Sequence, residues 1–398
     1  IPTWEEKDPV TNYEHYLMNE GLINQDQADE IRSGIKKGIA DALKVAYAEV
    51  DIEADVAIEK TDVFQSFELN ESNPSGSKKE MRFIDAISDG LKEAMRKHDK
   101  LVLMGQDIAD YGGVFKVTEG FVEEFGRERV RNTPLCESAI VGSALGLSIK
   151  GWKGMMEMQF ADFVTCGFNQ IVNNLAKLHY RWDQNADVVV RMPTGAGVGA
   201  GPFHSQSNEA WFFHTPGLKI AYPAFPEDAK GLLLTAFEDP NPVMFFEHKA
   251  LYRSLSAEVA EGYYTIPFGK ANVVIEGNGM SVITYGMGVH WAMELAEKHP
   301  DLELEVVDLR TLSPIDEESI YESVKKTGKC IVLHEDCMSG GIGADLCSMI
   351  QDTCWSHLDA PVKRVASMDT PVPFAISLEN QFLPKGRFEQ VALELKSY

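Results

Sequence analysis

The sequence predicts an α/β protein with two parallel-sheet domains that follow a helical N-terminal segment. From Met81 onward, short apolar runs alternate with helical patterns, and such continuous apolar strands are typical of parallel sheets covered on both faces. The 398 residues are too many for one ordinary core and suit two or three domains. Hydrophobic residues at 44% and charged residues at 25% are globular values, which excludes a fibrous or wholly disordered chain.

The first block, residues 1–67, is predicted to be helical. Asn24 can cap a helix that has Gln27 at its third position, and an apolar stripe follows at steps of four residues. The stripe consists of Ile31, Ile35, Ile39, Leu43 and Tyr47. An isolated helical hairpin cannot bury this stripe, so we expect it to need a partner surface. Residues 68–80 are polar and carry Asn, Pro, Gly and Ser, which predicts a linker.

The second block, residues 81–267, is predicted to be an α/β domain. A helix that carries Phe83, Ile84, Ile87 and Leu91 leads into the first apolar run. The predicted strands lie at 101–105, 155–160, 188–193 and 242–248. The helix over 140–151 is rich in small residues, Gly142, Ala144 and Gly146, which permit the close approach of another helix. Glycines cluster at 195–201, where we expect a close backbone approach or turns with positive φ.

The third block, residues 268–398, is predicted to be a second, smaller α/β domain. Its strand patterns lie at 272–276, 281–286, 304–310 and 329–336, and helical patterns separate them. The glycines at 340–343 are interpreted as a strand-to-helix turn, because no GxGxxG fingerprint stands in a strand–turn–helix context.

Charge and cysteine content narrow the possible partners and the compartment. The net charge of −24 argues against nucleic acid or an anionic membrane surface as a partner and permits a basic protein partner. No run of 18 apolar residues is present, so no segment is expected to span a membrane. The six cysteines form no CxxC pair and are expected to be reduced thiols of a cytosolic-type compartment.

Three places just after predicted strands could carry chemistry, because ligands of open α/β sheets bind at the carboxyl ends of strands. Glu137 stands directly before an apolar helix, where a carboxylate could also simply favour the helix dipole. Phe160 and Phe163 lie at the end of the second predicted strand of the domain and could instead be core aromatics. His204 follows the glycine cluster, where it could merely stabilise a loop through the neighbouring serines at 205 and 207.

A series of motifs in a fixed order favours the functional interpretation of these residues over the structural alternatives. The motifs are GQDIADYGGVFKVTEG, NTPLCESAIVG, MQFADF, FHSQSNEAWF, HTPGLKI, NPVMFFEHKALYR, VVDLRTLSPID and GGIGADL. Through them, nearly all of residues 81–398 resembles the β-type subunit of the thiamine-dependent 2-oxo acid dehydrogenases, the decarboxylating components of lipoyl complexes. The resemblance implies a thiamine-type pyrimidine-binding domain at 81–267 and a transketolase C-terminal-like domain at 268–398.

The N-terminal block resembles a different part of the same family. Residues 7–31, KDPVTNYEHYLMNEGLINQDQADEI, look like the end of the α-type subunit, so residues 1–67 look like the tail of a fused α-type half. In this family the α-type half holds magnesium and the cofactor diphosphate through a GDG motif, and no such motif occurs here. The resemblance therefore implies that the cofactor is thiamine diphosphate, that the magnesium ligands lie on a missing α-type half, and that this chain alone is an incomplete site.

The resemblance also assigns roles to single residues. Glu137 would bond N1′ of the aminopyrimidine ring and favour its imino form, because a carboxyl group can share a proton with a ring nitrogen. Phe163 would stack on that ring, and Leu135 and Gln159 would line the same pocket. His204 would stand on the substrate side and supply a proton during acyl transfer to lipoamide.

A monovalent-cation site is a further expectation from some family members. Its candidates are the backbone carbonyls that precede Arg191, at Val188 and Val189, together with Asp239 and Asn241. The segment that holds Asp239 and Asn241, EDPNP, is otherwise interpreted as a turn.

Partners and substrate follow from the same resemblance. We expect an α₂β₂-like particle with a second β-type half, docked on a lipoyl acyltransferase core. The substrate is a small 2-oxo acid, and NTPLCE and FFEHKALYR look closer to branched-chain (2-oxoisovalerate) enzymes than to pyruvate enzymes. Transketolase-type activity and a non-catalytic assembly module are the alternatives. The expected compartment is the cytoplasm of a bacterium, or the mitochondrial matrix of a eukaryote.

Overall fold

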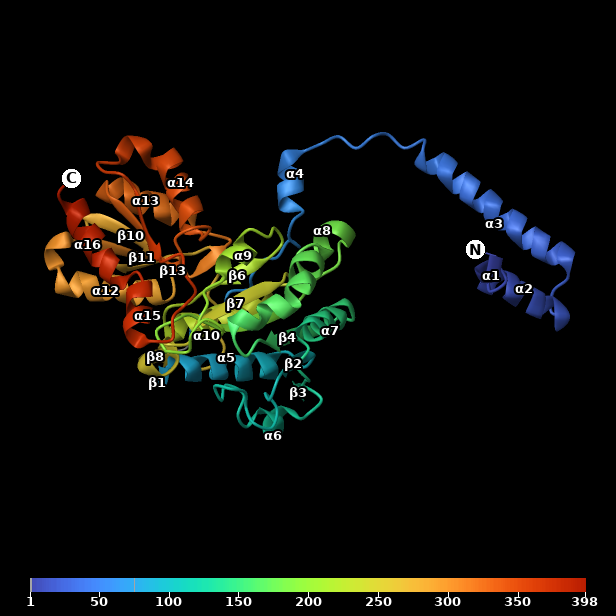
Figure 1. The fold of residues 1–398 in the computed structure, drawn as a ribbon, viewed down its shortest axis with the longest axis horizontal. Helices are drawn as coiled ribbons and strands as arrows, with labels where there is room; N and C mark the ends of the chain where they lie inside the picture. Colours follow the sequence, from blue (N-terminus) through green and yellow to red (C-terminus); the bar gives the residue numbers. More distant parts are fainter. Residues whose placement is uncertain (1, 75) are drawn as a thin grey trace. The chain divides into compact units, whose positions relative to one another are not determined.

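The computed structural model describes residues 2–74 and 76–398, which form two compact units. The division lies between Ile58 and Glu59, earlier than the end of the predicted helical block at residue 67. Each unit is described by itself below, and Figure 1 labels the elements of both. Every helix in residues 2–74 and 76–398 is too short or too polar to span a membrane.

The first unit is a set of helices. They are α1 (Pro2–Glu5), α2 (Pro9–Asn19), α3 (Gln25–Ala46) and the start of α4 (Val56–Thr61). The predicted capping box of α3 is confirmed: Gln27 N–H donates to Asn24 Oδ1 and Asn24 N–H donates to Gln27 Oε1, both at 2.9 Å. The apolar stripe of α3 is exposed along its whole length within this unit, from 47% at Leu43 to 84% at Tyr47.

The second unit is built around a seven-stranded sheet with the order β12-β6-β7-β5-β4-β2-β3. Its strands are β2 (Leu101–Gly105), β3 (Val130–Asn132), β4 (Lys153–Glu157), β5 (Val188–Thr194), β6 (Lys219–Ala221), β7 (Val243–His248) and β12 (Thr311–Ser313). All neighbours pair in parallel except β12, which runs antiparallel to β6. The prediction of a parallel sheet is therefore confirmed.

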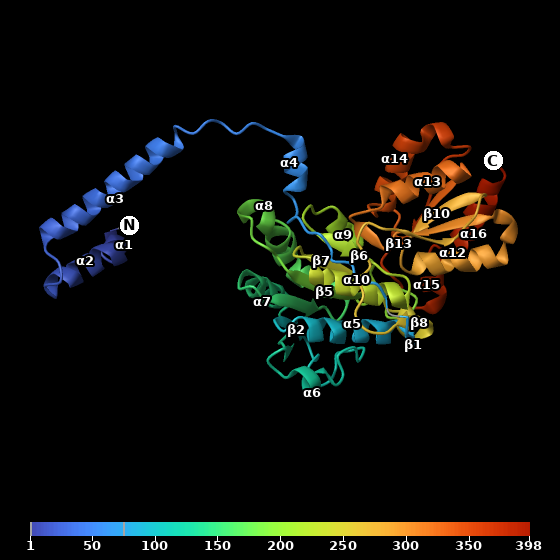
Figure 2. The ribbon, with the colours of Figure 1, turned by 180° about the vertical axis from the view of Figure 1, so that it is seen from behind.

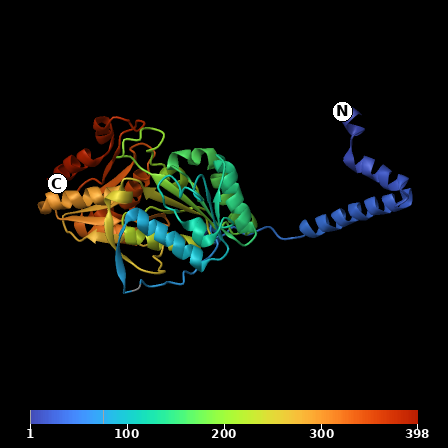
Figure 3. The ribbon, with the colours of Figure 1, turned by 90° about the horizontal axis from the view of Figure 1, so that it is seen from below.

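Helices cover both faces of this sheet, as the continuous apolar strands predicted. Leu101 and Leu103 of β2 pack in one core cluster with α5 (Phe83–Lys97) and α10 (Pro226–Glu238), and Val102 and Met104 pack in another with α7 (Glu137–Ile149). Figure 3 shows α5, in light blue, lying across one face. The remaining helices of this part are α6 (Phe121–Phe125), α8 (Leu178–Trp182), α9 (Glu209–Phe213), α11 (Leu251–Ser254), a 3-10 helix (Ala161–Gly167) and a π-helix (Gln170–Leu175).

A five-stranded sheet with the order β14-β13-β10-β11-β9 forms the C-terminal domain. Its strands are β9 (Asn272–Ile275), β10 (Met280–Thr284), β11 (Leu304–Asp308), β13 (Cys330–Cys337) and β14 (Lys363–Ser367), of which only β9 is antiparallel. Its helices are α12 (Met287–Lys298), α13 (Glu317–Thr327), α14 (Gly343–Cys354), α15 (Ile376–Phe382) and α16 (Lys385–Lys396), and the 3-10 helices are Pro300–Leu302 and Trp355–His357. Figure 2 shows these helices around β10 and β13.

The segment predicted as a linker, residues 68–80, is attached to the second unit. Its last residues begin β1 (Lys78–Arg82), which pairs antiparallel with β8 (Ser256–Ala260). Upstream, Ser72 N–H donates to Thr265 Oγ1 at 2.9 Å and Thr265 N–H donates back to Ser72 O at 3.0 Å. The side chain of Ser72 also donates to the carbonyl of Tyr263 at 3.2 Å, so this part of the predicted linker is hydrogen-bonded to the second unit.

Candidate active site

Four loops that follow neighbouring parallel strands form the candidate site. Gln106 follows β2, Glu137 follows β3, Phe163 follows β4 and His204 follows β5. Because β5, β4, β2 and β3 are consecutive in the sheet, their carboxyl ends lie at one edge. The structure therefore gathers the predicted residues at this edge.

Glu137 is the first residue of α7 and is half-buried. The side-chain amide of Gln106 donates to Glu137 Oε1 at 3.0 Å, which orients the carboxylate and leaves its second oxygen available. The helix-dipole interpretation and the catalytic interpretation both agree with this position. The turn that carries Phe163 packs on the start of α7, since a Cβ at Gly167 would lie 3.5 Å from the Glu137 carbonyl carbon.

An aromatic cluster joins Phe163 to His204. The ring centroid of His204 lies 4.7 Å from that of Phe160 and 5.6 Å from that of Phe163, both edge to face. Phe163 and Phe160 are half-buried, so they are not the fully buried core aromatics of the alternative interpretation. A half-buried ring leaves a face on which a flat heterocycle could stack.

The imidazole of His204 has no hydrogen bond to either neighbouring serine among the described residues. Ser207 Oγ instead donates to Glu335 Oε1 at 3.3 Å, and Ser205 Oγ is buried without a partner in the described part of the chain. His204 itself is partly exposed. Loop stabilisation through these serines therefore finds no support in the structure.

The two residues predicted to line the pocket lie at an open surface. Leu135 is 81% exposed in the loop before α7, and Gln159 is half-buried at the end of β4. A leucine so exposed beside an oriented carboxylate indicates that this side of the site needs a cover. The donor set of Glu137, Gln106 and Phe163 suits a flat, nitrogen-containing ring, because it offers a hydrogen-bonding carboxylate, an amide and an aromatic face.

The cation candidates have protein partners in this structure. Asp239 forms an ion pair with Lys219, and its Oδ1 accepts from Asn241 N–H at 2.9 Å, which confirms the predicted turn. Asn241 holds the backbone of Gln65, with Nδ2 donating to its carbonyl at 3.0 Å and Oδ1 accepting from its N–H at 2.8 Å.

The predicted cation site also includes Val188 and Val189, which are buried in β5. No cluster of three or more His, Cys, Asp or Glu side chains that could hold a metal occurs in residues 2–74 and 76–398. The monovalent-cation site stays a prediction.

Charged groups are buried close to the His204 loop. The Lys249 ammonium donates to Gly195 O at 2.6 Å, and burial lowers the pKa of Lys249 to about 8. Lys249 also borders a cavity of about 540 Å³ together with Phe115, Phe160 and Arg253. Next to the loop, burial and then Asp336 raise the pKa of Glu209 to about 8, so this carboxyl keeps its proton near neutral pH.

The sequence interpretation missed several residues of this region. Gln106 stands directly after β2, so the rule that identified Glu137 could have found it. Glu335 and Glu379 reach the glycine cluster from the C-terminal domain, and no local pattern marks them.

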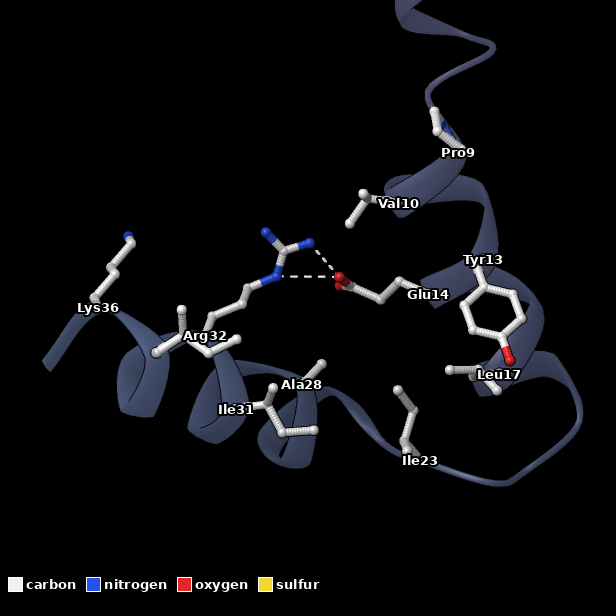
Figure 4. A pocket seen from close by; sticks show the side chains of 11 residues that line it. Pro9, Val10, Tyr13, Glu14, Leu17, Ile23, Ala28, Ile31, Arg32 and Lys36 are labelled. Carbon is white, nitrogen blue, oxygen red and sulfur yellow. Dashed lines mark hydrogen bonds and ion pairs between the residues drawn. The ribbon is translucent and has the colours of Figure 1, made fainter. Parts of the chain in front are cut away.

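The first unit has an apolar groove of its own, of about 620 Å³, between α2 and α3 (Figure 4). Its lining includes Val10, Tyr13, Leu17, Ile31 and Ile35. One ion pair, between Arg32 and Glu14, crosses it, with Arg32 Nε 3.0 Å from Glu14 Oε2. An apolar lining with one satisfied ion pair suits contact with another surface better than catalysis.

Comparison with known proteins agrees with this geometry. Residues 79–254 match the family described as "Transketolase, pyrimidine binding domain", and residues 269–387 match "Transketolase, C-terminal domain". A split-gene transketolase described as an inactive β4 tetramer shares the fold, with a TM-score of 0.63 and 23% identity over 79% of this chain and 99% of that chain.

Two relatives identify the family. The 2-oxoisovalerate dehydrogenase subunit beta of Bacillus subtilis is 46% identical over 76% of this chain and 94% of its own length. The pyruvate dehydrogenase E1 component subunit beta of Staphylococcus aureus is 41% identical over 77% of this chain and 95% of its own length. The chain therefore belongs to the β-type subunits of the thiamine-diphosphate-dependent 2-oxo acid dehydrogenases.

Proposed function

We propose that this chain supplies the aminopyrimidine half of the active site in a branched-chain 2-oxo acid dehydrogenase, which transfers the acyl product to lipoyl groups. The observation that carries the proposal is that Glu137, Phe163 and His204 follow the carboxyl ends of neighbouring strands, with the rings of Phe163 and His204 5.6 Å apart. Bound thiamine diphosphate would supply the electron sink for loss of carbon dioxide.

The residues of this chain would orient the cofactor and the substrate and exchange protons with them. Glu137, oriented by Gln106, would share a proton with N1′ of the pyrimidine ring and so favour its imino tautomer. Phe163 would present its ring face to the pyrimidine, and Leu135 and Gln159 would flank it. His204 would hydrogen-bond the substrate and donate a proton as the lipoyl disulfide opens.

The branched-chain substrate is supported by the higher identity to the 2-oxoisovalerate relative, 46% against 41% for the pyruvate relative. Pyruvate remains the second candidate, because part of the acyl pocket would come from an α-type half. Assays of the reconstituted enzyme with 2-oxoisovalerate and pyruvate in parallel decide between them. A higher kcat/KM for pyruvate would overturn the branched-chain assignment.

Three protein partners are part of the proposal. An α-type half would cover the open side at Leu135 and bring the magnesium ligands, and a second β-type half would pack near α7. Of the small residues there, Gly146 has open space around it, whereas Ala144 packs inward on Gly154. The third partner is a basic docking region of the lipoyl acyltransferase core, which suits a chain with net charge −24.

Sedimentation of the chain together with an α-type subunit tests this assembly, with an α₂β₂ mass expected and a stable monomer of this chain contradicting it. Such a complex would work in the bacterial cytoplasm or the mitochondrial matrix.

Glu137→Gln tests the cofactor role. An amide cannot drive the imino tautomer, so the variant should fold normally and lose nearly all hydrogen–deuterium exchange at C2 of the bound cofactor in the reconstituted enzyme. The exchange is measured by NMR after acid quench, with unfolding curves as the control for folding. Exchange at the wild-type rate would show that Glu137 has another role.

His204→Ala separates this proposal from transketolase-type chemistry. Loss of a general acid costs about 10²–10⁴ in rate, and the loss should fall mainly on lipoamide-linked turnover. Cofactor affinity should stay near the wild-type value, and decarboxylation with an artificial electron acceptor should fall less. Equal, mild losses in both assays would leave His204 a structural loop residue.

A further inference from the structure

The loop that carries His204 is poorly suited to hold its own shape. It connects β5 to α9 and has glycines at 195, 197, 199 and 201, all with positive φ between 67° and 91°. Glycines lose more conformational entropy on ordering than any other residue, so such a loop needs external bonds to stay in one conformation. This confirms the conformational role predicted for the cluster.

The C-terminal domain provides bonds to the middle of this loop. Glu379 of α15 accepts the backbone N–H of Gly197 at 2.9 Å and that of Gly199 at 3.0 Å. Glu335 of β13 accepts the N–H of Ala196 at 2.6 Å. We name these two carboxylates, Glu335 and Glu379, the loop clamp.

The pyrimidine domain holds the two ends of the loop. Lys249 donates to Gly195 O at 2.6 Å, and the side chain of Gln206 donates to Asp162 Oδ1 at 3.0 Å. The N–H groups at 196, 197 and 199 thus bond across the domain boundary, as does Ser207 Oγ, whereas Gly195 O and the side chain of Gln206 bond within the pyrimidine domain. The C-terminal domain therefore fixes the position of the middle of the loop.

The C-terminal domain also contacts the loop at Gly201. A Cβ at Gly201 would lie 2.5 Å from the ring of Phe374, so that ring rests on the loop backbone. Glu379 is 2% exposed and Glu335 is 6% exposed. Buried carboxylates that accept backbone N–H groups make charge-assisted hydrogen bonds, which are about twice as strong as neutral ones.

Glu335 has a second bond that fixes its direction. Its Oε2 lies 2.7 Å from Nε2 of His248, at the end of β7. Burial favours the neutral acid, but the charge and hydrogen bond of His248 outweigh it and lower the pKa of Glu335. The carboxylate is thus held in the ionised form that accepts from Ala196.

We propose that the loop clamp positions His204 for proton donation, so that two C-terminal-domain residues act as positioning residues for the reaction. The proposal rests on the function proposed for His204, and Glu379 is its main test because its side chain bonds only loop N–H groups among the described residues. Without Glu379, the N–H groups of Gly197 and Gly199 lose their acceptors, and the His204 ring loses its fixed place beside Phe160 and Phe163.

The first test is hydrogen exchange of the full chain followed by mass spectrometry. Glu379→Ala should speed amide exchange in the peptide 195–203 by about tenfold or more, with peptides of β10 and β13 unchanged. Asn380→Ala, an exposed neighbour on the same helix, is the matched control and should change neither. Glu379→Gln keeps the size and one acceptor oxygen and should give a smaller increase, which preserves the test if the alanine variant fails to fold.

The second test is a double-mutant cycle in the reconstituted enzyme. Glu379→Ala should lower lipoamide-linked turnover by about 10²-fold in the wild-type background, because misplacement of a catalytic group by about 1 Å has effects of this size. In the His204→Ala background it should lower turnover less than about threefold, since residues that act through each other are not additive.

The outcomes distinguish the clamp from the proposed function. Unchanged exchange in 195–203, or equal turnover losses in both backgrounds, would overturn the clamp. Faster amide exchange in 195–203 of Glu379→Ala, together with wild-type turnover of His204→Ala, would instead overturn the role proposed for His204.

Discussion

Helices α3 and α5 carry the same kind of apolar stripe and have opposite surroundings. In α5, Phe83, Ile87 and Leu91 are fully buried, and the helix packs on α10, where a Cβ added at Gly90 would be in ordinary contact with Lys230 at 3.4 Å. In α3, Ile31 and Ile35 are more than half exposed within their own unit. A helical period therefore predicts a helix and an apolar face in both cases, but only tertiary structure decides whether the chain itself covers that face.

Truncation of one stripe residue in each helix gives the largest expected difference. Leu91→Ala should destabilise the second unit by about 2–5 kcal/mol, because it leaves a cavity in a closed core. Ile35→Ala should change stability by less than about 0.5 kcal/mol, because its side chain is exposed. Urea unfolding of the full chain measures both. A comparable loss at Ile35 would show that another surface covers α3 in solution.

The buried carboxyl group of Asp308 should make the stability of the second unit depend on pH. Burial, and then the nearby Asp228, raise the pKa of Asp308 to about 8, so the folded chain binds a proton there that the unfolded chain releases near the ordinary value of 3.8. This contribution to stability is complete below pH 4 and is lost as pH rises towards 8, by up to about 1.4 kcal/mol per pH unit.

Asp308→Asn removes this pH dependence. Relative to wild type, the variant should gain stability as pH rises from 5 to 8, measured by thermal unfolding at each pH. Asp41→Asn on the exposed surface of α3 is the matched control and should show no such trend. A pH-independent difference at Asp308 would mean that the acid is ionised in the folded chain.

The smallest effect is expected at the ion pair in the groove of the first unit. Glu14→Gln removes its charge attraction to Arg32, whose side chain is 51% exposed, so the change in stability should be less than about 1 kcal/mol. High salt should abolish the difference. A larger, salt-resistant loss would show that the groove is closed to water when the chain is in solution.

Strands β2 and β5 could be predicted because each is a largely apolar run. The run 101–105 coincides with β2, and 188–193 differs from β5 by one residue. The three-residue strands β3, β6 and β12 were missed because three residues carry no period, and β1, β8 and β14 were missed because they mix charged and apolar residues. The positions of strand ends indicated three residues of the candidate site, Glu137, Phe163 and His204.

The loop clamp could not be predicted in the same way. Glu379 and Gly197 are 182 residues apart, and their hydrogen bond depends on how two domains pack. The hydrogen bonds between the predicted linker at 68–80 and Thr265 also join residues far apart in the sequence, so no local pattern could predict them.

Strand β12 has a consequence for the order in which the molecule can be made. Thr311–Ser313 belongs to the C-terminal part of the sequence, yet it supplies the edge of the seven-stranded sheet beside β6. On the ribosome, the first sheet must wait with an open edge until the chain has been synthesised beyond residue 313. Since the unpaired edge of a sheet invites association with other chains, the nascent protein is most exposed to aggregation during that interval.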